Sequence, residues 1–239
     1  MVLAFVGEEN HPLTISAMPV DGQIFNRLLI LPLFQGMSRS HLQEVVAHTR
    51  LGFSQHDEGT VIVRRGDRCT HQRFLVGGSL MAESESDTGD YSMREIITAP
   101  YLLQPERLFG LTQNYTYTFT AHSHCQILEI SKDEMVRLCA KFDIFRTNLL
   151  NILTTQSQRA ADEAWHEPAR QLPEKIKRFI MSHSLQPSGD KWLHIKMETL
   201  ARHISESRLN VSQQLRQWER DGLIHLSRNN IYFLDGFEI

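Results

Sequence analysis

The C-terminal residues 170–239 alternate between short helical and short strand-like patterns, and few folds accommodate their order. Apolar residues recur at helical spacing or alternate at strand spacing in successive segments. The segments predicted in chain order are a helix (173–185), a strand (191–196), a helix (197–204), a second helix (208–220) and a hairpin (222–234). Asn229 and Asn230 tolerate the positive φ of a tight hairpin turn. This order is typical of a winged helix-turn-helix.

The helix predicted over 208–220 has one apolar and one polar side. At 100° per residue, Val211, Leu215 and Trp218 fall together and are predicted to face the core. The candidate nucleic-acid contacts lie elsewhere on this helix or in its first turn: Arg208, Leu209, Asn210, Ser212, Gln213, Arg216 and Arg220. In a helix-turn-helix the second helix presents its N-terminal residues to base edges in the major groove.

The side chains on the polar face have distinct hydrogen-bonding capacities. Arg208 can form a bidentate contact with guanine, and Gln213 can do the same with adenine. Leu209 can contact a thymine methyl group, or it can pack against the preceding helix, and the sequence leaves both open. Ser207 is predicted to cap the helix, and its hydroxyl with the helix N-terminus can hold a phosphate.

Charge is distributed unevenly along the chain. Residues 168–239 hold 11 Lys/Arg and 8 Asp/Glu, a net charge of +3, whereas residues 1–167 hold 14 and 20, a net charge of −6. A mildly basic C-terminal unit on an acidic remainder indicates separate roles. Three further side chains are candidates for phosphate contacts or for ordinary surface charges: Lys196, Arg202 and Arg228.

Residues 51–131 have a different character from the rest of the chain. Short β-branched and aromatic runs, several of them separated by glycines or by the turn cluster SESDTGD, predict an antiparallel roll. Helical patterns precede the roll, so the fold class is α+β. We expect three units, namely a β-roll sensor domain with N-terminal helices (1–131), a helical segment ending in a hinge (132–167) and a winged helix-turn-helix (168–239).

A long helix predicted over 144–165 carries a seam with 3–4 spacing. Its large apolar residues give way to small ones toward the C-terminal end, and small residues let two helices approach closely. The seam therefore predicts either a dimer interface or packing on the sheet, with the dimer favoured because the second half is too polar for a buried helix. The seam and its neighbours are Leu149, Leu150, Ile152, Leu153, Ser157, Ala160 and Ala164.

Two motifs near the predicted recognition helix resemble the Crp/Fnr family of bacterial transcription regulators. They are Ser207-Arg208-x-x-Val211 and Glu219-x-x-Gly222-Leu223-Ile224, and Gly59, Gly66 and Gly78 also match the glycines of the family's cyclic-nucleotide-binding-like roll. The resemblance extends from about residue 23 over nearly the whole chain. It implies a sensor roll, a long dimerisation helix and a winged helix that binds a palindromic operator. The implied partners are double-stranded DNA and a second copy of the chain, and RNA polymerase stays open as another.

The chain departs from the family members that bind cyclic AMP. Their Gly-Glu pair falls here on Gln104-Pro105, and their Arg-Ser/Thr-Ala motif falls on Tyr115-Thr116-Tyr117. The arginine that would neutralise a cyclic phosphate is missing, which argues against cyclic AMP as the effector. A shifted site that uses Glu106 and Arg107 is conceivable. The candidate effector-pocket residues are Glu106, Arg107, Tyr115, Thr116 and Tyr117.

Cofactor and enzyme chemistry find little support in the sequence. Residues 1–68 contain no cysteine, which argues against the N-terminal iron–sulfur cluster of the oxygen-sensing members. His122-x-His124 could begin a metal or haem site, but a surface pair is favoured because no further ligand cluster accompanies it. We therefore expect no metal, no haem and, without a nucleophile–base pair or phosphate loop, no enzyme activity. No apolar run is long enough to span a bilayer, so a cytoplasmic protein is expected.

Two functional interpretations follow. The first is a homodimeric transcription regulator controlled by an effector of unknown identity. The second is a ligand-binding module whose winged helix contacts another protein. Two features favour the second interpretation: the positive charge of the C-terminal unit is modest, and Ser205 stands where the family resemblance implies a turn glycine. The backbone of Ser205 is expected to lie near the right-handed helical region. The surviving Arg and Gln side chains of 208–220 favour the first.

Overall fold

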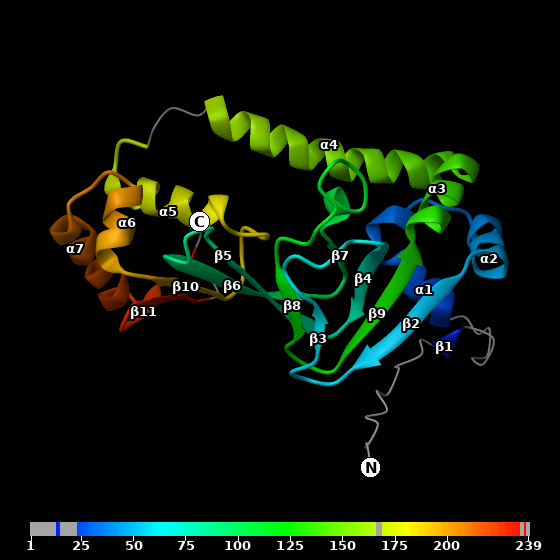
Figure 1. Cartoon of the computed structure of the whole chain (residues 1–239), viewed down its shortest axis with the longest axis horizontal. Helices are drawn as coiled ribbons and strands as arrows, with labels where there is room; N and C mark the ends of the chain where they lie inside the picture. Colours follow the sequence, from blue (N-terminus) through cyan, green and yellow to red (C-terminus); the bar gives the residue numbers. More distant parts are fainter. Residues whose placement is uncertain (1–12, 15–22, 166–168, 235–236, 238–239) are drawn as a thin grey trace, which may run out of the picture.

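The computed structural model describes residues 13–14, 23–165, 169–234 and 237, and it confirms an α+β fold with an antiparallel roll (Figure 1). The N-terminal part holds β1 (Leu13–Thr14), α1 (Gln23–Leu29), the 3₁₀ turn η2 (Pro32–Phe34) and α2 (Arg39–His48). The roll strands are β2 (Leu51–His56), β3 (Val61–Val63), β4 (His71–Gly77), β5 (Ser79–Glu85), β6 (Tyr91–Thr98), β7 (Tyr101–Leu103), β8 (Thr118–Ala121) and β9 (Cys125–Ser131), with the 3₁₀ turn η3 (Pro105–Arg107) after β7.

Alternation along the roll strands separates a helix-covered face from an interior face. The sheet ordered β1-β2-β9-β4-β7 turns Phe74 of β4 toward the helices, where its ring lies 6.2 Å from that of Phe34. Phe34 in turn meets Phe145 at 5.2 Å. Because successive side chains of a strand point to opposite faces, Arg73 and Leu75 lie on the interior side.

Two helices connect the roll to the C-terminal unit. Ser131 accepts a hydrogen bond from the Glu134 N–H and so caps α3 (Lys132–Lys141). The long helix α4 (Asp143–Trp165) begins against the roll, where Phe145 is fully buried. Figure 1 shows α4 running along the top of the molecule from the roll toward the C-terminal unit. The exposed second half of α4 leaves a helix surface that the rest of the described chain does not cover.

The C-terminal unit has the expected helix and strand order. It comprises α5 (Leu172–Ser182), β10 (Lys191–Ile195), α6 (Met197–His203), α7 (Arg208–Arg220), β11 (Ile224–Ser227) and β12 (Asn230–Phe233). Val211, Leu215 and Trp218 are buried in its core, as predicted from the helical spacing. The predicted hinge falls partly on residues 166–168, which lie outside the described residues.

Three local predictions need correction. Within the predicted roll, the aromatic run YTYTFTA (115–121) becomes a strand only from Thr118, as β8, since the N–H groups of Thr116 and Tyr117 bind Gln104 instead of a neighbouring strand. The hairpin turn uses Arg228 and Asn229, since Ser227 pairs with Asn230 across the ladder. Ser205 has a φ of +54°, in the left-handed region and not the right-handed one. That conformation lets the chain reverse between α6 and α7, at an energetic cost for a residue with a Cβ atom.

The sequence did not predict how the two units join. A seven-stranded antiparallel sheet runs in the order β11-β12-β10-β6-β5-β8-β3. Its first three strands belong to the C-terminal unit and the rest to the roll. Figure 1 shows β10 beside β6 under α5. The C-terminal unit is thus attached to the roll through continuous backbone hydrogen bonding.

Candidate nucleic-acid interface and sensor pocket

Helix α7 is held in place by its cap and by its apolar side. Ser207 accepts a hydrogen bond from the Asn210 N–H at 3.1 Å, which satisfies one of the free donors of the first turn. Val211 and Leu215 have no exposed surface, and Trp218 stacks edge-on against Phe237. Two anchored apolar turns and one capped end therefore fix which side of the helix faces outward.

The outward side of α7 presents polar groups that the protein itself does not use. Arg208, Gln213 and Arg216 are exposed, and they form no side-chain hydrogen bond or ion pair with the described residues. Leu209 is 66% exposed, so it does not pack against α6. A row of guanidinium and amide donors with an exposed apolar side chain at the helix start matches what base edges in a major groove require.

The other predicted contacts surround this face. Asn210 is exposed, whereas Ser212 is half-buried. Arg220 donates a hydrogen bond to the side-chain amide oxygen (Oε1) of Gln217, which directs it along the helix. Lys196 precedes α6 as an exposed N-cap residue, and Arg228 lies exposed in the hairpin turn. The remaining phosphate candidate, Arg202, forms an ion pair of 3.6 Å with Asp90 of the roll.

Gln104 binds the backbone of the segment that precedes β8. This buried side chain accepts hydrogen bonds from the N–H groups of Thr116 at 3.0 Å and Tyr117 at 3.3 Å. Its amide nitrogen donates to the Thr116 hydroxyl at 2.6 Å. Backbone N–H groups of this kind can bind an anion, but here their acceptor is supplied by the chain. Sequence reasoning missed this role of Gln104, although a long amide in a slot that takes glycine elsewhere was a usable signal.

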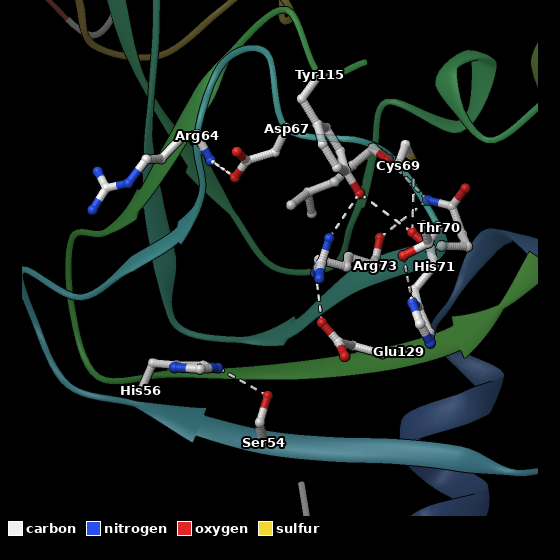
Figure 2. A network of polar contacts seen from close by, with 12 residues as sticks. Ser54, His56, Arg64, Asp67, Cys69, Thr70, His71, Arg73, Tyr115 and Glu129 are labelled. Atoms are coloured by element: carbon white, nitrogen blue, oxygen red, sulfur yellow. Dashed lines mark hydrogen bonds and ion pairs between the residues drawn. The ribbon is translucent and has the colours of Figure 1, made fainter. Parts of the chain in front are cut away.

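A polar network occupies the roll interior (Figure 2). Arg73 lies between Glu129 and Tyr115, donating to the Glu129 carboxylate at 2.5 Å and to the Tyr115 hydroxyl at 3.1 Å. The Tyr115 hydroxyl donates to the His71 carbonyl oxygen at 3.3 Å. Burial raises the pKa of Tyr115, so the phenol stays protonated and able to donate. Tyr115 was predicted at the pocket, but its partners Arg73 and Glu129 were not.

A separate cavity of about 410 Å³ lies between η3, α4 and the segment that follows α5. Of the five predicted pocket residues only Glu106 lines it, and Arg107 pairs with Glu106 at 3.5 Å. Tyr117 donates its hydroxyl to the His183 carbonyl oxygen, and burial raises its pKa to about 12. The cavity lining is mixed polar and apolar, consisting of Tyr101, Gln104, Glu106, Leu153, Gln156, Ser157 and Leu185.

The predicted dimer seam divides into two parts. Leu149 is buried, and Ile152 and Leu153 are half-buried against the core of the roll within the same chain. Leu150 is 53% exposed, and Ala160 is exposed in the second half of α4. Ala164 lies in α4, but its side chain is outside the described residues. Packing on the sheet thus accounts for the start of the seam, and the later part is free for another partner.

Neither a membrane-spanning helix nor a metal-binding cluster is found in the part of the chain that the structure describes. Within the described ranges, no helix combines the length and apolarity that crossing a membrane requires. Nor do the described residues bring together three or more His, Cys, Asp or Glu side chains in a way that could hold a metal ion. His124 instead contacts Asp57 at 3.1 Å.

Comparisons with known proteins agree with the geometry of the roll. Residues 54–142 match the family model of the cyclic nucleotide-binding domain. The sensor domain of the transcriptional regulator DNR from Pseudomonas aeruginosa is similar in structure, with 21% identity and a TM-score of 0.50 over 63% of this chain and 95% of that chain. This likeness supports the fold of the roll.

Two longer structures are similar at lower scores. DNR from Pseudomonas aeruginosa has 20% identity and a TM-score of 0.46, covering 91% of this chain and 96% of that chain. The Catabolite Activator Protein of Thermus thermophilus has 17% identity and a TM-score of 0.47, covering 84% and 93%. No curated protein matches the chain.

Proposed function

We propose that this chain, in which residues 54–142 match the cyclic nucleotide-binding domain, is a Crp/Fnr-type transcription regulator that binds DNA as a homodimer. The observation that carries the proposal is α7. Its apolar side is buried while Arg208, Gln213 and Arg216 face solvent without a partner among the described residues. In this assignment α7 enters the major groove, Arg208 reads guanine, Gln213 reads adenine, and Leu209 contacts a thymine methyl group.

The homodimer is assigned to the second half of α4. That half is largely exposed, and its small residues, such as Ala160, suit close contact with an identical helix. Two copies of α7 related by a two-fold axis bind half-sites about one helical turn of DNA apart, so the operator is palindromic.

The sensor roll is assigned an effector other than a cyclic nucleotide. Gln104 occupies the N–H groups of Thr116 and Tyr117, and Arg73 is engaged by Glu129 and Tyr115. A cyclic phosphate entering this slot finds Arg73 already paired and displaces an amide that already satisfies the backbone. The cavity beside η3, which contains the Glu106 carboxylate, suits a neutral or cationic small molecule instead.

The test is selection of bound sequences from a random duplex library, followed by footprinting on the DNA upstream of the protein's own gene. We expect a palindromic site with two half-sites, bound by the dimer. Arg208→Ala should weaken binding by about tenfold and relax the preference at one guanine position, as loss of a bidentate base contact requires. Arg39→Ala, which removes an exposed arginine from α2, is the matched control and should bind normally.

The same experiment addresses the second interpretation, in which the winged helix binds a protein. The pairing of β10 with β6 already places one face of the winged helix against the roll of the same chain, which favours that interpretation. A library from which no duplex is enriched, together with equal behaviour of Arg208→Ala and Arg39→Ala, would decide for it and against the DNA-binding proposal.

A further inference from the structure

The winged helix is paired with the roll along a whole strand. β10 and β6 are antiparallel from Lys191 opposite Glu95 to Ile195 opposite Tyr91. The other edge of β10 pairs with β12, so the winged helix keeps its own sheet whether or not β6 is present. The contact with β6 can therefore be lost without dismantling the C-terminal unit.

Each unit places apolar surface in the core of the other. Met93 of β6 is 2% exposed and belongs to the core of the winged helix, together with residues such as Ile180 and Leu193. Leu185, which follows α5, packs against the core of the roll and forms one wall of the cavity beside η3. The exchange makes the contact specific, because each side chain has a place only when the units are docked.

Glu95 joins the two units electrostatically. Its carboxylate lies 3.1 Å from the Lys191 ammonium group, and both side chains are 1% exposed. The same carboxylate accepts hydrogen bonds from the N–H groups of Leu185 at 2.6 Å and Gln186 at 3.2 Å. All three donors come from the winged-helix unit. A buried carboxylate with complete compensation from the other unit stabilises one docked geometry.

Docking also places an acidic residue beside the candidate DNA-binding face. Asp90, in the turn between β5 and β6, pairs with Arg202 of α6, whereas Asp87 of the same turn pairs with Arg65 of the roll. The ring of Tyr91 meets that of His203, the last residue of α6, at 5.2 Å. The negative charge of this turn lowers the positive potential around α6, and Arg202 is a candidate phosphate contact. DNA binding depends on that potential.

We propose that the roll holds its own winged helix through a latch and that the latched form binds DNA weakly. The latch consists of the β6–β10 pairing, Glu95 with Lys191, and Leu185. This inference rests on the proposed DNA-binding function and adds its regulation. Because Leu185 is a wall of the cavity beside η3, a small molecule larger than the present volume of about 410 Å³ has to displace Leu185 and so favours release. Ligand binding and docking then compete, so each weakens the other by the same factor.

The first experiment measures docking without DNA. Hydrogen–deuterium exchange of the full chain, read on peptides covering β6 and β10, reports whether the strands are paired. Leu185→Ala removes the cavity wall and should accelerate exchange in both strands several-fold. Met181→Ala, a truncation of a 37% exposed side chain on α5, is the control and should leave exchange unchanged. Equal exchange in the two variants would overturn the latch.

The second experiment measures the effect on DNA. Ser92 and His194 are register partners in β6 and β10, and Cα atoms of such pairs are close enough for a disulfide. In a Ser92→Cys, His194→Cys variant, oxidation should weaken binding to the selected duplex roughly tenfold, and reduction should restore it. Leu185→Ala should bind more tightly than Met181→Ala.

The outcomes separate the latch from the function beneath it. DNA binding that is equal for the oxidised and reduced forms overturns the latch alone. Absence of DNA binding in every variant, with β6 and β10 still responding to Leu185→Ala in the exchange experiment, overturns the proposed function and with it the regulatory role of the latch.

Discussion

The interior of the roll and the outer face of α7 carry similar polar groups in opposite states. Arg73 is enclosed by Glu129 and Tyr115, and Gln104 binds the backbone that surrounds it. Arg208 and Gln213, on the outer face, have no such partner within the described part of the chain. Buried polar groups need hydrogen-bond partners inside the protein, whereas exposed ones can bind water or a ligand. The polar side chains of the roll are therefore satisfied within the protein, whereas those on the outer face of α7 remain available to a ligand.

The largest effect is expected when the interior pairing is broken. Arg73→Met leaves the Glu129 carboxylate in the roll without its cation and should lower the free energy of unfolding by about 3 kcal/mol, measured by urea denaturation. Adding Glu129→Leu should recover most of the loss, because both charges are then removed. DNA affinity at equal folded concentration should not change. A loss of DNA binding in the folded Arg73→Met protein would contradict the claim that the roll interior and the outer face of α7 act independently.

A smaller effect is expected at Gln104. Gln104→Ala removes the acceptor of two backbone N–H groups and should destabilise the protein by about 2 kcal/mol. The freed N–H groups also offer an anion site, so inorganic phosphate should raise the melting temperature of this variant more than that of the unaltered protein. If phosphate stabilises both proteins equally, the slot is not closed by Gln104.

A substitution on the outer face of α7 should lower DNA affinity and leave the stability of the fold unchanged. Arg216→Ala should weaken DNA binding by about 1 kcal/mol, measured by fluorescence anisotropy on the selected duplex, with an unchanged melting temperature. Arg39→Ala on α2 serves again as the control. A clear drop in the melting temperature would mean that Arg216 supports the fold and is not available for a ligand.

The smallest effect concerns the turn that aims α7. Ser205→Gly should stabilise the protein by roughly 0.5 kcal/mol, because glycine adopts a φ of +54° without the Cβ penalty but loses more chain entropy on folding. Asn229→Gly is the matched change at the other turn, where asparagine already tolerates a positive φ, and should have less effect. Thermal denaturation of both variants measures the difference, and a destabilised Ser205→Gly protein would contradict the assignment of strain to this turn.

The sequence predicted what depends on local periodicity. The buried side of α7, the cap at Ser207 and the antiparallel character of residues 51–131 were all readable from spacing and turn residues. The exposed face of α7 was predicted from the same helical spacing, because side chains opposite Val211 and Leu215 must point outward.

The sequence could not predict contacts between residues far apart in the chain. Arg73 meets Glu129 and Gln104 meets Thr116 only after the strands have been placed, and no local pattern encodes their register. The pairing of β6 with β10 is the clearest case, since each strand had another neighbour that satisfied its local pattern. The left-handed conformation of Ser205 was not predicted because serine, unlike glycine or asparagine, does not indicate a positive φ.

The most direct test of the account is the salt dependence of DNA affinity. The dissociation constant for the selected palindromic duplex would be measured between about 50 and 200 mM salt for the unaltered protein and for Arg208→Ala, Arg216→Ala. The account predicts a loss of affinity of about a hundredfold or more over this range, with a shallower dependence in the double variant, because neutralised phosphates release counterions. An affinity that is independent of salt, or a double variant that is indistinguishable from the unaltered protein, would contradict the assignment of α7 to DNA.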